Sequence, residues 1–454
     1  MIDEQRITLL NNRPILSEKS YGVYWMQASQ RVNQNEALAF AIQQANFLGK
    51  PLVVYFALAP NFAGATKRHY RFMLEGLKET QLALRERNIP LFLSTMGMVE
   101  GLEKLADDMA FLVVDAAYSR LERGWRNTFA SSVSCACFEV ESNVVVPLRV
   151  VTQKEEYSAA TLRRKIEPMI SYFAQQIEIP ELLVSSLSLQ CPFISADGES
   201  VDSLLDTLQL ADEQAKGYRY PGGAEAAHQR LADFIEHRLD GYASKRNNPA
   251  LNHSSDLSAY LHFGQISSIE IYHTMKTIDL VDVPAFLEQL IVRRELAYNY
   301  VCFNPHYDSY EALPAWARAS LGSHAQDRRP VIYTYAELEA GQTHDRYWNT
   351  AQRELIELGT MHNYLRMYWG KKILEWSPDA KTAFETALKL NNTYQMDGRD
   401  PNGYAGVAWC FGKHDRPWVE RPIFGSIRYM NDKGLERKFD MQKYIERVEK
   451  EIEG

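Results

Sequence analysis

The sequence predicts an α/β domain with a doubly wound, five-stranded parallel sheet, followed by an all-helical domain. Short apolar runs alternate with amphipathic stretches in the N-terminal third, and helical periodicity dominates from Glu225 onward. Between these two regions the composition shifts to Ser, Leu, Asp and Gly. At 454 residues the chain is also too long for one ordinary hydrophobic core. We therefore expect the α/β domain at residues 1–180, a connector at 181–224 and the helical domain at 225–454.

Five apolar runs are expected to form the sheet. They occupy residues 21–26, 51–58, 89–94, 110–116 and 136–141. Amphipathic stretches such as 68–88 separate them, and crossover helices of this kind make the strands they connect parallel. No G-x-G-x-x-G follows the first strand, and no G-x-x-x-x-G-K-[ST] occurs in the chain. The usual dinucleotide and triphosphate fingerprints are therefore absent.

Composition narrows the class of protein. Hydrophobic residues make up 46% and charged residues 24%, as in soluble globular proteins. No apolar run reaches the roughly 18 residues of a membrane span. The acidic N-terminus does not resemble a signal peptide, and the five cysteines are scattered. A reduced, cytoplasmic protein is expected, and the histidines show no metal-ligand spacing.

The net charge of −8 argues against indiscriminate binding of nucleic acid. Basic residues nevertheless gather between Lys413 and Lys438. This stretch could be a local DNA-binding face or simply a solvated rim, and the sequence leaves both readings open.

Two segments near the C-terminus indicate redox chemistry on a bound ring system. Trp369 and Trp376 lie seven positions apart, so a helix would place them on one face about two turns, roughly 10 Å, apart. The segment 390–409 combines acids, Asn and Gly in a loop suited to a polar ring. Upstream, a serine-rich segment at 254–258 leads into a predicted helix, where free N–H groups suit a phosphate. Ordinary core packing and an ordinary helix cap are the alternatives.

Taken in order, several motifs resemble those of the photolyase–cryptochrome flavoproteins. They are SSDLSAYLHFGQIS (254–267), WNTAQ (348–352), MHNYLRMYW (361–369) and LNNTYQMDGRDPNGYAGVAW (390–409). The chain is most similar to class II cyclobutane pyrimidine dimer photolyases, over nearly its whole length. The resemblance implies an antenna-type α/β domain, a helical domain that holds FAD, and light-driven electron transfer to a flipped lesion in UV-damaged DNA.

The resemblance also assigns cofactor-binding residues. They are Tyr242, Ser254, Ser255, Leu257, Ser258, Asn363, Arg366, Asp397, Asp400 and Gly403. Arg366 and Asp397 match an ion pair beside the flavin ring, and Asn391 matches a residue that faces flavin N5. A neutral amide there would tune protonation of the flavin without the repulsion that a carboxylate would impose.

Electron-transfer and DNA-binding residues follow from the same resemblance. Trp369, Trp348 and Trp376 match the tryptophan relay that reduces the flavin under light. On the DNA side, Trp409 matches an aromatic that stacks on the flipped bases, and Met367 matches a pocket residue beside it. Arg416 and Arg428 match arginines that hold the duplex and fill the gap left by flipping, largely without sequence preference.

The segment 283–296 departs from the class II pattern. The alignment places Gln289 and Arg293 where the family has a Glu that hydrogen-bonds the lesion and a Trp that stacks on it. Gln can donate and accept but supplies no charge. Arg can stack on a base or reach a phosphate. A one-residue shift would bring Glu288 into the pocket instead, but this requires an irregular helix.

These departures leave alternatives open. The chain could be a working dimer photolyase, a photolyase for another lesion, or a cryptochrome-like blue-light photoreceptor. Asn363 and Met367 stand where 6-4 photoproduct enzymes carry a His pair, which argues against that branch. A dark flavin oxidoreductase is the outside alternative, disfavoured by the missing nicotinamide fingerprint.

The remaining expectations concern the antenna and the partners. Ala28 and Glu36 depart from the class pattern. Whether an antenna chromophore binds, and whether it is a deazaflavin or a folate, therefore stays open. UV-damaged DNA is the expected partner, with no membrane, no obligate protein partner and a monomeric state.

Overall fold

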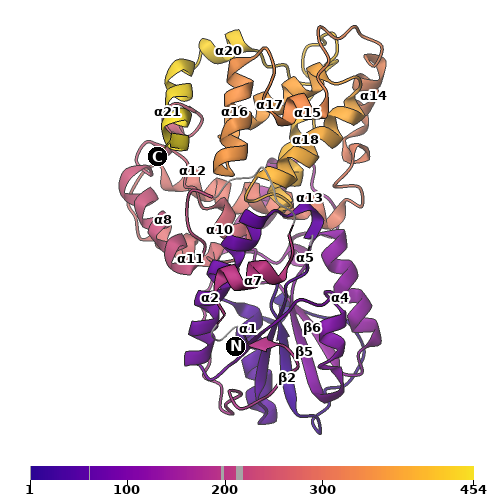
Figure 1. The fold of residues 1–454 in the computed structure, drawn as a ribbon, viewed down its shortest axis with the longest axis vertical. Helices are drawn as coiled ribbons and strands as arrows, with labels where there is room; N and C mark the ends of the chain where they lie inside the picture. The colour runs from indigo at the N-terminus through magenta and orange to yellow at the C-terminus, as the bar shows by residue number, and fades with distance from the viewer. Residues whose placement is uncertain (1, 61, 196–198, 211–217, 454) are drawn as a thin grey trace.

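The computed structural model describes residues 2–60, 62–195, 199–210 and 218–453. The α/β part forms one end of the molecule and the helical part the other (Figure 1). This confirms the predicted fold class of an α/β domain followed by an all-helical domain.

A seven-stranded sheet in the order β1-β6-β5-β2-β3-β4-β7 forms the centre of the α/β part. The five predicted strands are its parallel core: β2 (Tyr21–Trp25), β3 (Leu52–Ala57), β4 (Leu91–Ser94), β5 (Met109–Asp115) and β6 (Ala136–Val140). Every residue of β2, β3 and β5 is buried, as expected for parallel strands covered on both faces. Two short antiparallel strands that the sequence did not reveal close the edges, β1 (Ile7–Leu9) and β7 (Ile194–Ser195).

Helices cover both faces of the sheet, as in a doubly wound fold. One face packs on α1 (Glu36–Leu48) and α2 (Lys67–Glu86), and the other on α3 (Glu100–Glu103) and α4 (Arg120–Ser132). Hydrogen bonds from side chains fix where these helices begin: Asn35 accepts from Leu38 N and Ser119 from Glu122 N. Three short 3₁₀ turns complete this part, at Glu4–Arg6, Phe62–Gly64 and Ala106–Asp108.

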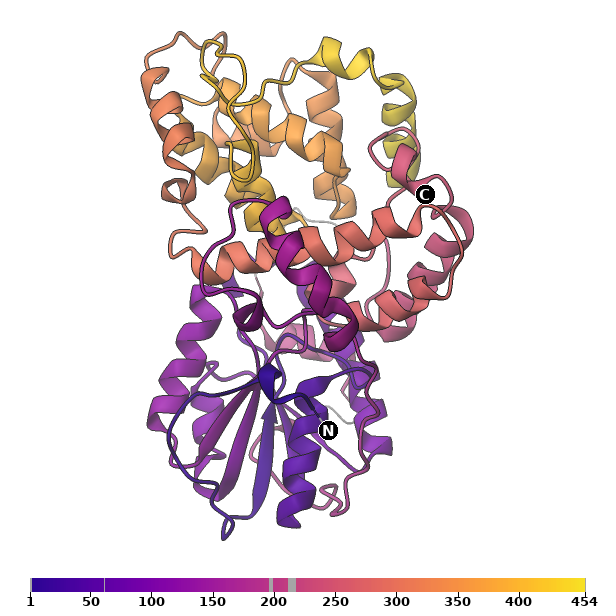
Figure 2. The ribbon, with the colours of Figure 1, turned by 180° about the vertical axis from the view of Figure 1, so that it is seen from behind.

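The segment after β6 joins the two parts. It contains α5 (Leu148–Val151) and α6 (Ala159–Phe173), and α6 crosses the helical part (Figure 2). Glu295, fully buried in the helical part, accepts hydrogen bonds from Val145 N at 2.6 Å and Val146 N at 3.4 Å. Burial raises the pKa of this carboxyl to about 8, although the backbone N–H groups favour its charged form.

Within the predicted connector, 181–224, two short elements pack on the α/β part. β7 pairs with β4, and α7 (Val201–Thr207) packs against α2. Residues 196–198 and 211–217 of this connector lie outside the described residues. The described portions thus pack on the sheet domain through β7 and α7.

The helical part runs from residue 224 to 453. Its helices are α8 (Ala224–His237), α9 (Tyr242–Lys245), α10 (Ser258–His262), α11 (Ser268–Lys276), α12 (Val283–Leu287), the π-helical segment η4 (Glu288–Arg293), α13 (Arg294–Phe303), the 3₁₀ turn Tyr310–Ala312, α14 (Ala315–Ser323), α15 (Tyr335–Glu339), α16 (Arg346–Leu358), α17 (Asn363–Trp376), α18 (Ala380–Tyr394), α19 (Pro401–Cys410), α20 (Asp432–Glu436) and α21 (Met441–Glu453). None of the described helices is long and apolar enough to span a bilayer.

Local sequence explains the helix ends that matter for the site. Asp345 begins α16 by accepting from Tyr347 N and Trp348 N, and Gly359 ends it in a left-handed conformation. Asp400 begins α19 by accepting from Asn402 N, with Pro401 at the first helical position. α16 packs beside α17, and Asp400 contacts His262 at the end of α10.

Candidate active site

A large cavity of the helical part has a volume of about 370 Å³. Its walls come from α9, the loop before α10, η4, α13, α17 and the loop before α19. Nine of the ten predicted cofactor-binding residues line it: Tyr242, Ser254, Ser255, Leu257, Ser258, Asn363, Arg366, Asp397 and Asp400. The structure thus brings together residues that are up to 158 positions apart in the sequence, from 242 to 400.

The serine-rich edge of the cavity is held by a charged pair. Asp256 adopts a left-handed backbone conformation and accepts from Arg238 Nη1 at 2.7 Å. Ser254 Oγ lies 3.2 Å from both Asn252 Oδ1 and Asp256 Oδ1. α10 begins at Ser258, as predicted for the helix start. The hydroxyls therefore stand at a fixed loop-to-helix corner.

Asp400 forms part of the opposite edge. Its carboxylate lies 3.2 Å from His262 Nδ1 and is buried. Burial alone would raise its pKa, but the hydrogen bond and charge of His262, with Arg294 and Asn402 N, lower that pKa below its usual value. Asp400 is therefore ionised at neutral pH and presents a fixed negative charge to the cavity.

Among the residues that the structure describes, four buried polar atoms of cavity-lining side chains lack a hydrogen-bond partner. They are Arg366 Nε, Gln395 Oε1, Asp397 Oδ1 and His414 Nε2. Within the described part of the chain no ion pair joins Arg366 and Asp397, although the resemblance implied one. His414 Nδ1 donates to Tyr157 O at 2.9 Å, so its Nε2 is an acceptor. Because buried polar groups are normally satisfied, one donor and three acceptors left open here fit a polar ring with both kinds of edge. The cavity and its donor set therefore fit the flavin of FAD.

Asn391 and Gly403 lie next to each other outside the described cavity lining. The Asn391 side chain is 2% exposed, and its Nδ2 donates to Asn392 Oδ1 at 3.2 Å. A Cβ at Gly403 would stand only 3.0 Å from Asn391 Nδ2 and 3.4 Å from Asp397 O. Gly403 thus makes room for the Asn391 amide beside the Asp397 backbone.

The three predicted relay tryptophans form one contiguous chain. The rings of Trp369 and Trp348 are stacked with centroids 6.4 Å apart, and Trp348 meets Trp376 edge-on at 5.6 Å. Each ring is almost completely buried. Trp369 is one helical turn after Arg366 on α17, so the chain starts beside the cavity wall.

Hydrogen bonds fix the first two rings of this chain. Trp369 Nε1 donates to Gln352 Oε1 at 2.8 Å, and Trp348 Nε1 donates to Trp369 O at 3.1 Å. Both indole N–H groups are therefore satisfied, as buried indoles require. Beyond Trp376 the structure adds Tyr333 and His344, with ring centroids 5.4 and 5.3 Å from it. No sequence spacing connected these two residues to the relay.

Gln289 and Arg293 both line the cavity from η4. Their segment is irregular, as the Glu288 alternative required, because it is π-helical. Glu288 nevertheless does not reach the cavity lining of the described residues: it accepts from Arg163 at 2.5 Å and lies 3.3 Å from Arg293 Nε. Of the two candidates, Gln289 and not Glu288 lines the described cavity.

Trp409 on α19 also lines the cavity and is 36% exposed. The fully buried Lys371 donates to Cys410 O, which holds the end of α19 in place. Burial lowers the pKa of Lys371 to about 8. Met367 is outside the cavity lining, and its Sδ lies 3.9 Å from Cys410 Sγ.

Arg416 and Arg428 lie on a loop that follows α19, on either side of Trp418. Their guanidinium carbons are 5.4 and 5.1 Å from the Trp418 ring centroid, and Trp418 is 40% exposed. Sequence reasoning missed Trp418, although its place between the two arginines in the chain was a usable signal.

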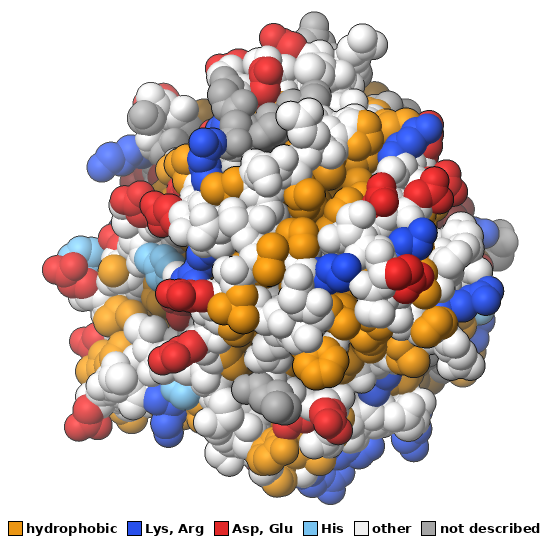
Figure 3. Space-filling view, turned by 90° about the horizontal axis from the view of Figure 1, so that it is seen from below, with side chains coloured by type: hydrophobic (Ala, Val, Ile, Leu, Met, Phe, Trp, Pro, Cys, Tyr) orange, Lys and Arg blue, Asp and Glu red, His pale blue; other side chains and the backbone are white. Residues whose placement is uncertain are grey.

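At the opposite end of the molecule, Lys and Arg side chains are mixed with Asp and Glu around apolar ones (Figure 3).

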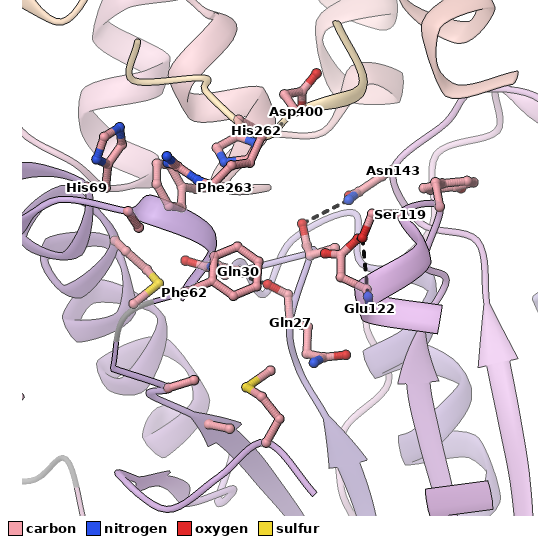
Figure 4. Close-up of a pocket in the computed structure, with 18 of the residues that line it drawn as sticks. Gln27, Gln30, Phe62, His69, Ser119, Glu122, Asn143, His262, Phe263 and Asp400 are labelled. Atoms are coloured by element: carbon pink, nitrogen blue, oxygen red, sulfur yellow. Dashed lines mark hydrogen bonds and ion pairs between the residues drawn. The ribbon is translucent and has the colours of Figure 1, made fainter. Parts of the chain in front are cut away.

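A second pocket, of about 140 Å³, lies at the carboxyl ends of β2, β3 and β5. In an open α/β sheet this edge, where the strand order reverses, is the usual ligand site. Gln27 and Gln30 line it, and the Oε1 atom of each is buried with no hydrogen-bond partner in the described part of the chain. His262 and Asp400 of the helical part close it from the other side (Figure 4). Asp400 therefore borders both cavities.

Comparisons with known proteins agree with this arrangement. A model of the DNA photolyase family matches residues 22–181. The chain is 44% identical to the deoxyribodipyrimidine photo-lyase of Methanothermobacter thermautotrophicus over 448 residues, which cover 99% of each chain.

Two solved structures share the fold. A class III photolyase from Agrobacterium tumefaciens superposes with a TM-score of 0.72 at 18% identity, over 95% of this chain and 86% of that one. An archaeal photolyase from Sulfolobus tokodaii, solved with two FAD molecules, gives 0.71 at 16% identity, over 94% and 89%. At these identities the likeness concerns the fold alone.

Proposed function

Because this chain belongs to the DNA photolyase family, we propose that it is a light-driven lyase that uses reduced FAD to split cyclobutane pyrimidine dimers in UV-damaged DNA. The observation that carries the proposal is the arrangement of α17. This helix presents Arg366, with an unpartnered Nε, to the large cavity, and one turn later it carries Trp369, the first ring of the buried relay. A cofactor in the cavity would therefore lie beside a ready path for electrons.

The cavity residues would hold FAD by two kinds of contact. Ser254, Ser255 and Ser258, at the corner before α10, suit the phosphates. Arg366, Asp397 and Gln395 offer unpartnered donor and acceptor atoms to the ring. When bound, reduced and excited by light, FAD supplies the single electron that opens the cyclobutane ring and takes it back. The protein contributes position, exclusion of water and the Trp369–Trp348–Trp376 relay that keeps the cofactor reduced.

The same cavity would take up the flipped dimer on its η4 side. The Gln289 amide can donate to and accept from the base edges, and the exposed face of Trp409 can stack on them. Arg416 and Arg428, beside Trp418, would hold the duplex and fill the gap that flipping leaves. We propose that the chain belongs to the class II branch because of the geometry of its tryptophan relay. Gln289 and Arg293 would then form a variant of the class II lesion pocket.

The second pocket is proposed to hold an antenna chromophore. The unpartnered Gln27 Oε1 and Gln30 Oε1 are acceptors, so they suit a ring that carries N–H donors. Deazaflavins and folates both offer such groups, and their absorption spectra after release from the purified protein would distinguish them. We also propose that the protein acts as a monomer, because one chain supplies the cavity, the relay and the arginines. Its cytoplasmic location stays a prediction from composition.

Repair of a defined oligonucleotide tests the function. The purified protein is loaded with FAD, photoreduced, mixed with an oligonucleotide that carries one thymine dimer, and exposed to blue light, with a dark control. We expect light-dependent recovery of intact thymines. If FAD binds and photoreduces but no thymine is recovered, the dimer assignment is wrong. A 6-4 photoproduct substrate, run in parallel, then asks whether another lesion is repaired.

A further inference from the structure

One of the open polar atoms of the large cavity takes no part in the proposed contacts to FAD. Arg366, Asp397 and Gln395 are proposed to meet the flavin ring, which leaves His414 Nε2. This nitrogen is buried, and no described residue gives it a hydrogen bond. Because a buried polar atom without a partner is costly, we expect His414 to meet a donor that belongs to a ligand.

The side chain of His414 is held in one orientation and one tautomer. His414 Nδ1 lies 2.9 Å from Tyr157 O, a carbonyl oxygen that can only accept, so Nδ1 carries the proton and Nε2 keeps its lone pair. The Tyr300 ring meets the imidazole edge-on, with centroids 5.8 Å apart. Burial, together with the positive charges of Lys413 and Arg293, lowers the pKa of His414 to about 4. The imidazole is therefore neutral at pH 7, and Nε2 can only accept.

The turn that carries His414 is anchored on both sides. Lys413 N donates back to Ala408 O at 3.1 Å, which closes the end of α19. The Lys413 side chain donates to Ala312 O at 3.1 Å and pairs with Glu155. The imidazole is thus in place before a ligand arrives, so binding does not have to order it.

His414 lies at the end of the cavity away from the proposed flavin contacts. α19 runs from Asp400, in the loop beside the flavin site, to Trp409 and Cys410. At 1.5 Å per residue, Asp400 and Trp409 are roughly 13 Å apart along this helix. His414 follows the Trp409 end, and it is close enough to Arg293 of η4 for that charge to act on its pKa. His414 therefore belongs to the η4 side, where the dimer is proposed to enter.

We propose that His414 Nε2 accepts a hydrogen bond from the N3–H group of one base of the flipped dimer, and that Gln289 Oε1 accepts the same bond from the other base. The inference rests on the function proposed above and specifies which lesions the pocket favours. A thymine–thymine dimer presents two N3–H donors, each between two carbonyl oxygens. The η4 side offers one acceptor for each of them.

This pairing predicts discrimination against bases that lack N3–H. The N3 atom of cytosine carries no proton, and neither does N3 of the pyrimidone ring in a 6-4 photoproduct. With either lesion two acceptors would face each other, and the buried imidazole nitrogen would stay unpaired. The favoured lesions are therefore dimers of two thymine or uracil bases.

Two substitutions of His414 separate the loss of the acceptor from damage to the fold. Its backbone is left-handed, with a φ of 56°, which Gly adopts freely and Asn tolerates. His414→Gly removes the acceptor, and His414→Asn offers an amide oxygen in its place. Asn88→Gly, at an exposed left-handed position of the α/β part with a φ of 63°, is the matched control. The FAD content of each purified variant shows that it is folded.

Binding of modified lesions in darkness tests the proposal. The FAD-loaded protein is titrated with oligonucleotides that carry a thymine dimer, either unmodified or with a methyl group on N3 of the 5′ or the 3′ base. In the wild type and Asn88→Gly, each methyl group should weaken binding by about tenfold, because it leaves a buried acceptor unpaired. His414→Gly should bind the unmodified dimer about fivefold more weakly, with affinity for undamaged DNA unchanged.

The decisive result is the coupling between variant and methyl group. In His414→Gly one of the two methyl groups should cost less than about twofold, whereas the other should keep its full effect. Gln289→Leu should show the opposite pattern, and His414→Asn should bind the unmodified dimer better than His414→Gly.

Other results would overturn the proposal. Methyl effects in His414→Gly equal to those in the wild type, or wild-type affinity of this variant for the unmodified dimer, would remove His414 from the lesion contacts. Repair under blue light by chemically reduced wild type is measured with the same oligonucleotides. If the dimer is repaired while the methyl effects do not depend on His414, the proposed function stands and this inference alone fails. If the coupling is found but no dimer is split, the lesion contacts stand and the lyase assignment fails.

Discussion

The two walls of the large cavity are built differently. On the relay side, α16 and α17 place three buried indoles in ring contact, and hydrogen bonds to Gln352 and to a backbone carbonyl orient the first two. On the lesion side, Gln289 and Arg293 lie on a π-helical segment, and Arg293 is 3.3 Å from Glu288 at the surface. The two positions that the sequence analysis set apart from the class II pattern, Gln289 and Arg293, both lie on this segment.

The contrast indicates which features the chemistry tolerates. Electron transfer depends on ring separations, and a buried, close-packed wall holds these constant. Recognition of a flipped base depends on hydrogen bonds and stacking that several side chains can supply. We therefore expect changes on the relay wall to abolish cofactor reduction, and changes on the lesion wall to shift affinity by smaller factors.

The largest effect is expected for Trp369→Phe. This change keeps an aromatic ring in the core but removes the most easily oxidised group next to the cavity and the hydrogen bond to Gln352. Photoreduction of bound FAD should fall to background, as followed by flavin absorbance under blue light. Trp316→Phe, on α14, is the control outside the relay. Photoreduction at the wild-type rate in Trp369→Phe would contradict the expectation that changes on the relay wall abolish cofactor reduction.

Acid should weaken the relay wall through His362, which begins α17. Burial, with the positive charge of Arg447, lowers the pKa of His362 to about 4. The folded state therefore keeps this imidazole neutral while the unfolded chain protonates it below about pH 6.5. The stability it contributes is complete above pH 6.5 and is lost as the pH falls toward 4, at most about 3 kcal/mol.

His362→Asn isolates this contribution, because Asn can keep the helix cap and does not titrate. Urea unfolding at pH 7 and at pH 4.5 measures it. We expect a smaller loss of stability on acidification for the variant than for the wild type. Equal losses would mean that His362 does not couple this wall to pH.

A smaller effect is expected on the lesion wall for Gln289→Leu. The change removes both hydrogen-bonding groups at similar volume, and one neutral hydrogen bond is worth about 1 kcal/mol. Affinity for a thymine-dimer oligonucleotide should fall by about fivefold, with affinity for undamaged DNA unchanged. Gln229→Leu, at an exposed position of α8, is the control. An equal loss for both DNAs would show that Gln289 does not read the lesion.

The smallest effect should come from the second pocket, which lies apart from both walls. Gln30→Leu removes one acceptor that faces it. We expect a few-fold weaker retention of the antenna chromophore, by analogy with one hydrogen bond of about 1 kcal/mol, and unchanged photoreduction of FAD. A change in photoreduction would mean that the pocket is coupled to the relay, for example through Asp400 and His262.

The sequence predicted the parts of the fold that repeat a strong pattern. The five parallel strands were found because each is a continuous apolar run, whereas β1 and β7 have only three and two residues and carry no such signal. The start of α19 at Pro401 also follows from its capping residue, Asp400, whereas α10 begins at Ser258 without a side-chain cap.

The candidate site was predictable where a motif carried it. Nine of the expected cofactor-binding residues could be named because they belong to recognisable motifs, and the structure places them around one cavity. Among the described residues Arg366 and Asp397 form no ion pair with each other, which the sequence did not predict. Tyr333 and His344 were missed because they come from two loops that meet only when α15 and α16 pack beside Trp376. The choice between Gln289 and Glu288 as the cavity residue also needed the structure. Only the ion pairs of Glu288 with Arg163 and Arg293 show that this side chain points away from the cavity.

The most direct test of the division between the two walls uses Trp369→Phe after chemical reduction of its FAD. Single-turnover repair of a thymine-dimer oligonucleotide under blue light is compared with that of chemically reduced wild type. The account predicts equal repair, because the relay wall serves only to reduce the cofactor and the lesion wall is intact. Loss of repair in the chemically reduced variant would contradict it, and would show that the two walls do not act separately.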